Sequence, residues 1–468
     1  MAIPKITAWL LFLLITSMAG SFAEESGLMT SSSPLKQRTF LDCYQKVLAH
    51  YPSLQKRYEQ LEQAKARRNI AISDLFPHIQ GIASMTTTTD PVNVFGMLLR
   101  QNKFTEGDFA LNKLNDPNHR TDYHFGISGE MLLFDSFNTI SKIRVARSLV
   151  KSADLQADFT EMEAGIVALE SYLGILLARQ TFDHATAVKN QSAEDLKQAE
   201  DLNQKGMILG ADFYAAKVTS AGIERELNHA RTLLKNAYMF MNILMGEDLH
   251  SVWDAKGKLP EIKQDIAELN MWTVQAYQQR KDLAALDQMI DAQRIESLRH
   301  KTSFFPKIYG FANLNEHTPD WHTGGQDYTI GIKGTMDFFD PSYPGRVKEA
   351  KHYYEELKKD REMLRDNITR DLVEELARYE TATADHPVLR QAYEDARQAS
   401  DLTAKLYQEG RKSILDLLNM RRVYLETAVG LDQLLFALEL EHAKLLFLSG
   451  QLDEDGVRRV NTRLGGAN

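Results

Sequence analysis

The chain has 468 residues, a formal net charge of −9 and a single cysteine, Cys43. The acidic balance argues against a nucleic-acid partner, because such partners are bound by basic surfaces. One cysteine excludes an internal disulfide framework.

Residues 1–23 have the pattern of a secretory signal peptide. Lys5 precedes an apolar run from Ala8 to Met18, and Ser21-Phe22-Ala23 follows as a small-residue cleavage site. We place cleavage after Ala23. The alternative, a short transmembrane anchor, is weaker because the run is too short to span a bilayer. No later segment approaches 18 consecutive apolar residues, so a mature chain that crosses a membrane should do so as strands.

Two helices are predicted after a polar, Ser-rich arm at residues 24–36. They run from about Leu35 to Ala49 and from Ser53 to Ser73. The second ends at Leu-Phe-Pro-His-Ile, where proline marks a change from helix to strand. The sequence Phe-Phe-Pro-Lys-Ile repeats this event around Pro306.

Two similar segments, 122–135 and 327–340, alternate apolar and polar residues and share eight of fourteen positions. Alternation over roughly ten residues is typical of strands in an outer-membrane β-barrel. A sheet packed on a soluble core is the alternative, but the signal peptide and the long helices favour the barrel. We expect partner strands at 78–85 and 307–315 and a long polar loop at 86–121. Four strands cannot close a barrel, so the spanning unit should be an oligomer, and three copies would give twelve strands.

A long helical hairpin follows the first strand pair. The run from Phe137 to Lys205 has no proline and predicts a helix on the order of 100 Å long. Gly206 should end it in the left-handed conformation, and the return arm should start near Asp212, a common N-cap type. The apolar stripe of this arm alternates steps of three and four, as in a left-handed coiled coil. It comprises Phe213, Ala216, Ser220, Ile223, Leu227, Ala230, Leu234, Ala237, Met241 and Leu244.

The same pattern recurs 204 positions later without a gap. The offset pairs Ala146 with Ala350 and Gly206 with Gly410, and it indicates an internal duplication. We therefore predict a mainly α fold with a small β part, in two tandem repeats of a long coiled-coil α-hairpin plus an antiparallel β-hairpin. The first repeat is 24–246 (β-hairpin about 78–134, coiled hairpin 136–246), 247–261 is a linker, the second repeat is 262–450 (β-hairpin about 307–339, coiled hairpin 341–450), and 451–468 is a polar, loosely ordered tail.

Three duplicated features carry a family resemblance that extends from about Phe40 to Gly450. They are the Phe-Pro starts of the first strands, the Leu-Phe-Asp-Ser and Phe-Phe-Asp-Pro exits from the second strands, and the turns. The turns run from Gln204-Lys-Gly206 to Asp212 and from Tyr407-Gln-Glu-Gly410 to Asp416. In these features the chain resembles the TolC-like outer-membrane efflux family.

The resemblance implies a homotrimer in the outer membrane of a Gram-negative bacterium. Its twelve-stranded β-barrel would continue into an α-helical barrel through the periplasm, and would meet outer-membrane lipid. A periplasmic adaptor protein would link it to an inner-membrane pump. The implied function is the exit duct of a tripartite efflux pump or type I secretion system.

The family closes its periplasmic mouth with a polar network near the turns. By position, the resemblance assigns this gate to Asp212, Tyr407, Lys412 and Asp416. Lys412 stands where the best-known member has an arginine, and lysine cannot make bidentate bonds. Asn419 replaces a second acidic residue.

Asp416 has two readings. Three copies around the axis of a trimer would form a carboxylate ring that attracts cations. Alternatively, Ser413-Ile-Leu-Asp416 is a capping box, and both roles can coexist. For Asp212, helix capping is favoured over gating.

The turns at 207–211 and 411–415 are the natural adaptor contacts, since they are apolar tips on exposed loops; alternatively they pack on each other. Pro387 falls inside the second long arm and should kink or break it. The expected adaptor-contact residues are Gly206, Met207, Leu209, Gly410, Arg411 and Ile414.

Catalytic motifs are missing from the sequence: there is no HExxH, GxSxG or phosphate-binding glycine loop, so we expect neither an enzyme nor a cofactor. His317, Asp320 and His322 could ligate a metal, but exposed loop histidines are more often plain surface, and we expect no metal site. The alternative function is a periplasmic coiled-coil adaptor or scaffold. An adaptor needs one hairpin and soluble β-domains, whereas this chain has two hairpins and paired amphipathic strands.

Overall fold

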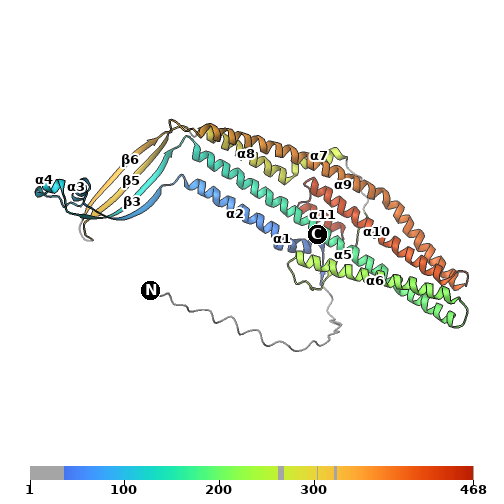
Figure 1. The fold of residues 1–468 in the computed structure, drawn as a ribbon. Helices are drawn as coiled ribbons and strands as arrows, with labels where there is room; N and C mark the ends of the chain where they lie inside the picture. The colour runs from blue at the N-terminus through green and yellow to red at the C-terminus, as the bar shows by residue number, and fades with distance from the viewer. Residues whose placement is uncertain (1–35, 262–267, 303, 321–323, 467–468) are drawn as a thin grey trace, which may run out of the picture. The chain divides into compact units, whose positions relative to one another are not determined.

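Helices dominate the computed structural model, which contains a small part of β-structure (Figure 1). It describes residues 36–261, 268–302, 304–320 and 324–466. The predicted signal peptide and nearly all of the polar arm lie outside these residues. No helix in the described ranges combines the length and the hydropathy needed to span a bilayer.

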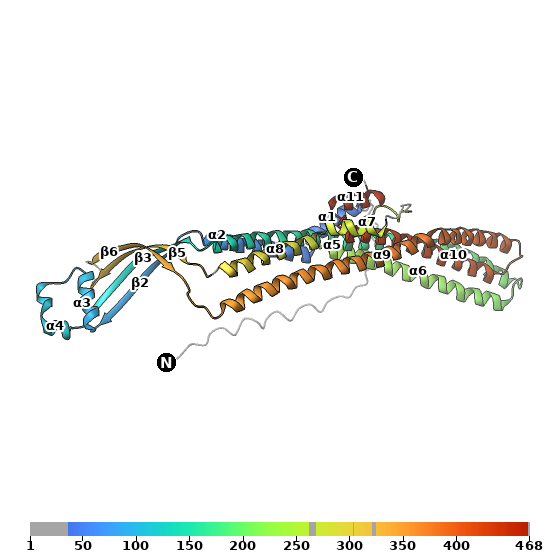
Figure 2. The ribbon, with the colours of Figure 1, turned by 90° about the horizontal axis from the view of Figure 1, so that it is seen from above.

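Four antiparallel strands form the main sheet, in the order β2-β3-β5-β6. The central pair β3–β5 joins the first half of the chain to the second. Figures 1 and 2 show this sheet at one end of the unit formed by residues 37–468, and the turns of the two long hairpins at the other. The strands are β2 (His78–Thr88), β3 (Arg120–Phe134), β5 (Lys307–Thr318) and β6 (Gly325–Thr335).

Six helices form the wall between the sheet and the turns. α2 and α6 both pack along α5, and α8 and α10 both pack along α9. Two shorter helices therefore run beside one long helix, because their combined rise matches its length. α8 and α10 also contact α5, so the two halves share one wall. The bounds are α2 (Pro52–Ser73), α5 (Asn138–Gln204), α6 (Gly210–Leu244), α8 (Lys281–Thr302), α9 (Tyr343–Gln408) and α10 (Ile414–Leu448).

Smaller elements surround the middle of this wall and share its main hydrophobic core. The Tyr172 hydroxyl of α5 donates to the carbonyls of Arg38 and Lys256, which ties the parallel pair β1–β4 to the long helix. These elements are β1 (Gln37–Arg38), α1 (Phe40–His50), β4 (Asp254–Ala255), α7 (Leu269–Gln279) and α11 (Glu454–Arg463).

The prediction of a loosely ordered C-terminal tail is wrong. Asp453 caps α11 by accepting from the backbone N–H of Gly456, and Val457 and Val460 on the inner face of the helix are fully buried. Arg463 at its end donates to the buried carboxylate of Glu439. Few apolar residues in a polar segment suffice here because their spacing places them on one helix face.

The segment predicted as a linker is also packed. Trp253 and Leu259 are buried, and the Trp253 indole N–H donates to Asn242 over 2.8 Å. The second repeat was placed from residue 262; residues 262–267 lie outside the described part of the chain, and α7 begins at Leu269.

Pro387 was expected to kink or break the second long arm, and it does not break it. α9 runs as one helix from Tyr343 to Gln408 with Pro387 inside it. Proline removes one backbone hydrogen bond, but α9 packs along α7, α8 and α10, and this tertiary contact holds the helix together.

Candidate functional site

The sheet has one apolar and one polar face, as the alternation predicted. In an antiparallel pair, residues directly opposite each other project to the same side. The register places Ile127 opposite Leu314, and Ala312 opposite Ile330, and Ile330 is 75% exposed. The apolar face carries Ile79, Ala83, Met85, Tyr123, Phe125, Ile127, Met131, Ile308, Ala312, Leu314, Tyr328, Ile330 and Ile332.

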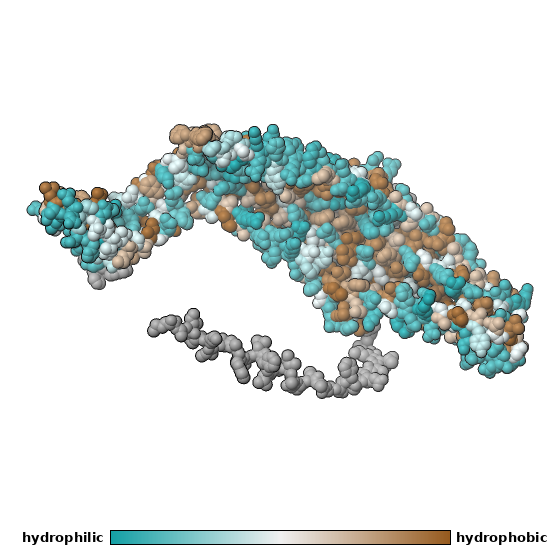
Figure 3. Space-filling view, in the orientation of Figure 1, coloured by the Kyte–Doolittle hydropathy of each residue, from teal (hydrophilic) through white to brown (hydrophobic). Residues whose placement is uncertain are grey.

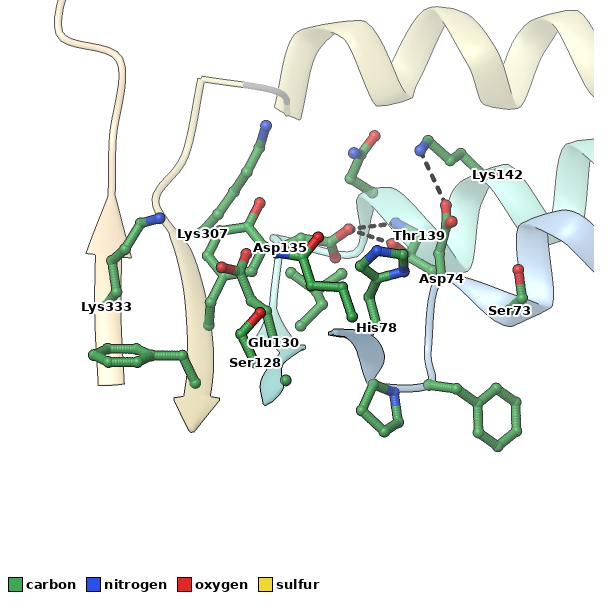
Figure 4. Close-up of a pocket in the computed structure, with 18 of the residues that line it drawn as sticks. Ser73, Asp74, His78, Ser128, Glu130, Asp135, Thr139, Lys142, Lys307 and Lys333 are labelled. Carbon is green, nitrogen blue, oxygen red and sulfur yellow. Dashed lines mark hydrogen bonds and ion pairs between the residues drawn. The ribbon is translucent and has the colours of Figure 1, made fainter. Parts of the chain in front are cut away.

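The opposite face is mostly polar, although Leu132, Tyr309 and Phe311 also lie on it, and it is hollowed where the sheet meets the helices (Figure 4). A concavity of about 1000 Å³ opens there. Figure 4 shows charged side chains from several elements around it, and Lys142 of α5 pairs with Asp74 over 3.2 Å. The lining therefore suits water and ions. Its charged residues are Asp74, Glu130, Asp135, Lys142, Lys307 and Lys333.

An aspartate follows the second strand of each half and starts the next helix. Asp135 accepts from the backbone N–H and the hydroxyl of Thr139. Asp340 accepts from Ser342 and pairs with Arg346, and these bonds, from Ser342 foremost, lower the pKa of Asp340 to about 2. The Asp residues of the two strand exits thus fix the change from strand to helix.

The two hairpin turns share one conformation and one cluster. Gly206 and Gly410 have φ of +71° and +73°, the left-handed region that favours glycine. Beneath them the ends of all four hairpin helices meet in a hydrophobic cluster. It comprises Ala199, Phe213, Ala216, Tyr407, Ile414, Leu417 and Leu418.

Within one copy, the structure brings together only part of the gate predicted from the resemblance. Ser413 and Asp416 form the predicted capping box at the start of α10. The Ser413 bonds lower the pKa of the Asp416 carboxyl, with a smaller contribution from Lys412. The Lys412 amine lies 4.0 Å from Asp416, and both are about half exposed.

Tyr407 and Asp212 lie apart from that pair. Tyr407 is buried in the cluster, where its hydroxyl has no hydrogen-bond partner among the described residues, and burial together with Asp195 raises its phenol pKa. The prediction that Asp212 caps its helix is wrong: Leu209 is the N-cap residue of α6, because the helix begins three residues earlier than expected. Asp212 lies in the first turn of α6, where the helix dipole stabilises a negative charge.

The predicted adaptor-contact residues divide into two groups. Met207 and Leu209 are 69% and 71% exposed, and Arg411 is an exposed partner of Glu409. Ile414 is not an exposed tip, because it is 2% exposed inside the cluster. For Ile414 the alternative of packing within the turns is correct.

A polar contact between the hairpins was not anticipated. Arg421 of α10, buried to 8% exposure, donates to Asp195 and Gln191 of α5 over 2.9 and 2.7 Å. The sequence contained an indication of this contact. Arg421 follows Leu417 by one helical turn, so it lies on the apolar side of α10.

Of the three residues weighed as metal ligands, His317 and Asp320 lie in the described part of the chain. The His317 imidazole pairs with Asp122 over 2.7 Å, and His322 lies outside the described residues. In the described part of the chain no group of His, Cys, Asp or Glu is arranged to hold a metal ion.

A family model for the outer membrane efflux protein matches residues 43–247 and 272–444, well over half of the chain. The chain belongs to the outer membrane efflux protein family. The resemblance to TolC-like channels is thereby confirmed. The family places this efflux protein in transport at the outer membrane.

Solved structures of outer-membrane channels share its fold. The Campylobacter jejuni channel CmeC is 15% identical, with a TM-score of 0.73 over 91% of this chain and 89% of that chain. VceC of Vibrio cholerae is 16% identical, with a TM-score of 0.70 over 88% and 96%. The open state of MtrE from Neisseria gonorrhoeae is 14% identical, with 0.69 over 89% and 90%. No curated protein matches the chain.

Proposed function

We propose that this efflux protein is the exit duct of a tripartite efflux pump or of a type I secretion system. It conducts substrate passively from an inner-membrane pump across the periplasm and the outer membrane. The observation that supports this role most directly is the sheet, whose bare apolar face suits lipid and whose polar face suits a water-filled lumen.

The sheet argues for a homotrimer. β2 and β6 are its edges, and each has one neighbour in the described part of the chain. Open edges with an apolar face cannot stay unpaired in lipid. If β6 of one copy pairs with β2 of the next, three copies close a twelve-stranded barrel.

The helical wall offers a surface for the same assembly. Apolar side chains are exposed over α5, α6 and α10 (Figure 3), where they border a groove of about 790 Å³. Phe240 and Ile243 of α6 are 64% and 55% exposed. Burying such residues against a neighbouring copy would continue the wall into an α-helical barrel.

The hairpin turns are the proposed contact with a periplasmic adaptor, which in turn binds the pump. Exposed Met207 and Leu209 supply apolar contact area, and Arg411 supplies charge. Asp212, Tyr407, Lys412 and Asp416 are the proposed gate. The alternative role, a periplasmic adaptor or scaffold, does not explain an exposed apolar sheet face.

Reconstitution tests the proposal. Protein purified from detergent-extracted outer membranes should have the mass of a trimer and conduct ions in planar bilayers. The pair Asp212→Asn and Asp416→Asn should change conductance or cation block. Ser413→Ala is the control, since it removes the capping hydroxyl and keeps the carboxylate. Unchanged traces in the Asp pair would leave Asp416 only its capping role, and a soluble monomer without conductance would refute the duct.

A further inference from the structure

The connection between β2 and β3, residues 89–119, is a folded body and not the long polar loop expected from the sequence. We call it the lid. Asp90 caps its first helix, and the Phe104 ring packs edge-on against Phe95 and Phe109 with centroids 5.1 and 5.0 Å apart. It comprises α3 (Pro91–Arg100), the 3₁₀ helix η1 (Glu106–Phe109) and α4 (Leu111–Asn115).

The lid lies over the polar face of the sheet. Gly325 is paired with His317, so a side chain at position 325 would point to the same face as the imidazole. A Cβ there would clash with the carbonyl oxygen of Arg100, the last residue of α3. The α3 backbone therefore covers this face at the end of the sheet farthest from the helices.

Gln101, directly after α3, fastens the lid to the sheet. It is 1% exposed, and its amide N–H groups donate to the Thr121 carbonyl and to Asp122 Oδ1 over 3.0 and 2.8 Å. Its amide oxygen accepts from Arg120 over 2.7 Å. Every hydrogen-bonding group of this side chain is thus directed at β3.

The chain of contacts continues across the sheet. Asp122 Oδ2 pairs with His317 Nδ1 on β5, and the His317 ring stacks on His124 with centroids 4.5 Å apart and planes 6° from parallel. Asp122 and His317 are buried, whereas Ser128 and Thr329 farther along the polar face are not. We call Gln101, Asp122 and His317 the latch.

We propose that the lid narrows the outer mouth of the duct and sets the size of solutes that pass, and that the latch holds it closed. This inference rests on the proposed function, because the polar face lines a lumen only in a closed barrel. A buried amide bonded to a carboxylate is costly to separate, so the closed position is the stable one.

Thiol labelling in intact cells tests the lid. Ser128→Cys places a thiol on the polar face below the lid, and the native Cys43 gives no background because it is buried, with its pKa raised to about 12 by burial. A small maleimide and a maleimide carrying a long polyethylene glycol chain are added outside the cells. Three further changes are each made in the chain that carries Ser128→Cys. They are Gln101→Ala, Gly325→Ala and replacement of the lid by a short Gly-Ser turn. Gly334→Ala in the same strand is the control, because a Cβ there meets nothing within 4 Å.

We expect the small reagent to label every chain and the large one to label only the unlatched and lidless chains. Gln101→Ala should speed large-reagent labelling by about tenfold, the shift expected when a buried hydrogen bond to a charged group is lost. Equal large-reagent labelling of the original and lidless chains would overturn the lid and leave the duct intact. If neither reagent labels Ser128→Cys in the lidless chain, position 128 does not face an open lumen, and the proposed duct fails with the lid. The lidless variant keeps the test decisive if a point variant fails to assemble.

Discussion

Arg421 of α10 and Asp195 of α5 lie 226 positions apart in sequence and meet with Nε 2.9 Å from Oδ2. Their side chains are 10% and 14% exposed. Farther along the same two helices, the His184 imidazole lies 3.3 Å from Asp432. A ladder of polar contacts therefore holds the second hairpin to the long helix of the first.

Arg421→Ala should loosen α10 from α5 near the turns. It leaves Asp195 as an uncompensated, largely buried charge, at a cost on the order of 3 kcal/mol. Hydrogen exchange in the first half of α10 should become faster, and ion conductance through the reconstituted protein should rise. Arg370→Ala in α9 is the control, since Arg370 is exposed and pairs with its chain neighbour Asp371. Equal effects of the two variants would contradict a role for the buried contact.

Glu439→Gln should change how α11 docking depends on pH. Burial raises the pKa of Glu439 to about 7. The folded chain therefore binds more protons there than the unfolded chain, and the stabilisation from Glu439 is present below its usual pKa and lost as pH rises through about 7. Burial, aided by Arg463, lowers the pKa of His442 to about 4. That group stabilises above its usual pKa, and its contribution is lost as pH falls through about 4.

The pH dependences of stability from Glu439 and His442 oppose each other. Comparing Glu439→Gln with the original chain isolates the contribution of Glu439. Relative to the original chain, Glu439→Gln should gain stability from about pH 4.5 to 7, by at most about 3 kcal/mol. Protease cleavage around α11, measured across this range, reports the difference. Glu454→Gln on the exposed face of α11 should show no such trend; a parallel trend in both would contradict the assignment.

Gly450→Ala should destabilise the protein more than Gly410→Ala. Both glycines have positive φ, +79° and +73°, so alanine costs about 1–2 kcal/mol at either site. At Gly450 a Cβ would also lie 2.8 Å from the backbone carbon of Gln279, whereas at Gly410 it meets nothing within 4 Å. Thermal unfolding of the purified protein should show the larger loss for Gly450→Ala. Equal losses of stability in the two variants would mean that the backbone at Gln279 moves away easily from an added Cβ at Gly450.

Ile330→Lys and Thr329→Lys test the two faces of β6. Ile330 lies on the apolar face and Thr329 on the polar face. A lysine facing lipid near the bilayer midplane costs about 2–4 kcal/mol, whereas one facing the lumen is tolerated. Ile330→Lys should therefore reduce the amount of assembled protein in outer-membrane fractions, and Thr329→Lys should not. The reverse order would mean that the faces are assigned the wrong way round.

The features that followed from the sequence are those set by local chemistry. Alternation fixed the faces of the strands, and Gly206 and Gly410 marked the turns. The Ser413 capping box was visible because all its partners lie within four residues.

The features that were missed depend on distant partners. The tail folds as α11 because Arg463 bonds to Glu439 and the apolar residues of the helix pack on the core. Pro387 does not break α9 because neighbouring helices pack along it. The lid depends on contacts between Gln101 and a strand that begins 19 residues later. Such contacts cannot be predicted from the local amino-acid composition.

α5 contacts α2 and α6 of the first half of the chain and α8 and α10 of the second half. During export residues 138–204 emerge long before residues 414–448, so apolar surface on α5 must wait for most of the polypeptide to arrive. We therefore expect the secreted chain to need a holding chaperone until translocation is complete, and neither half to be produced stably without the other.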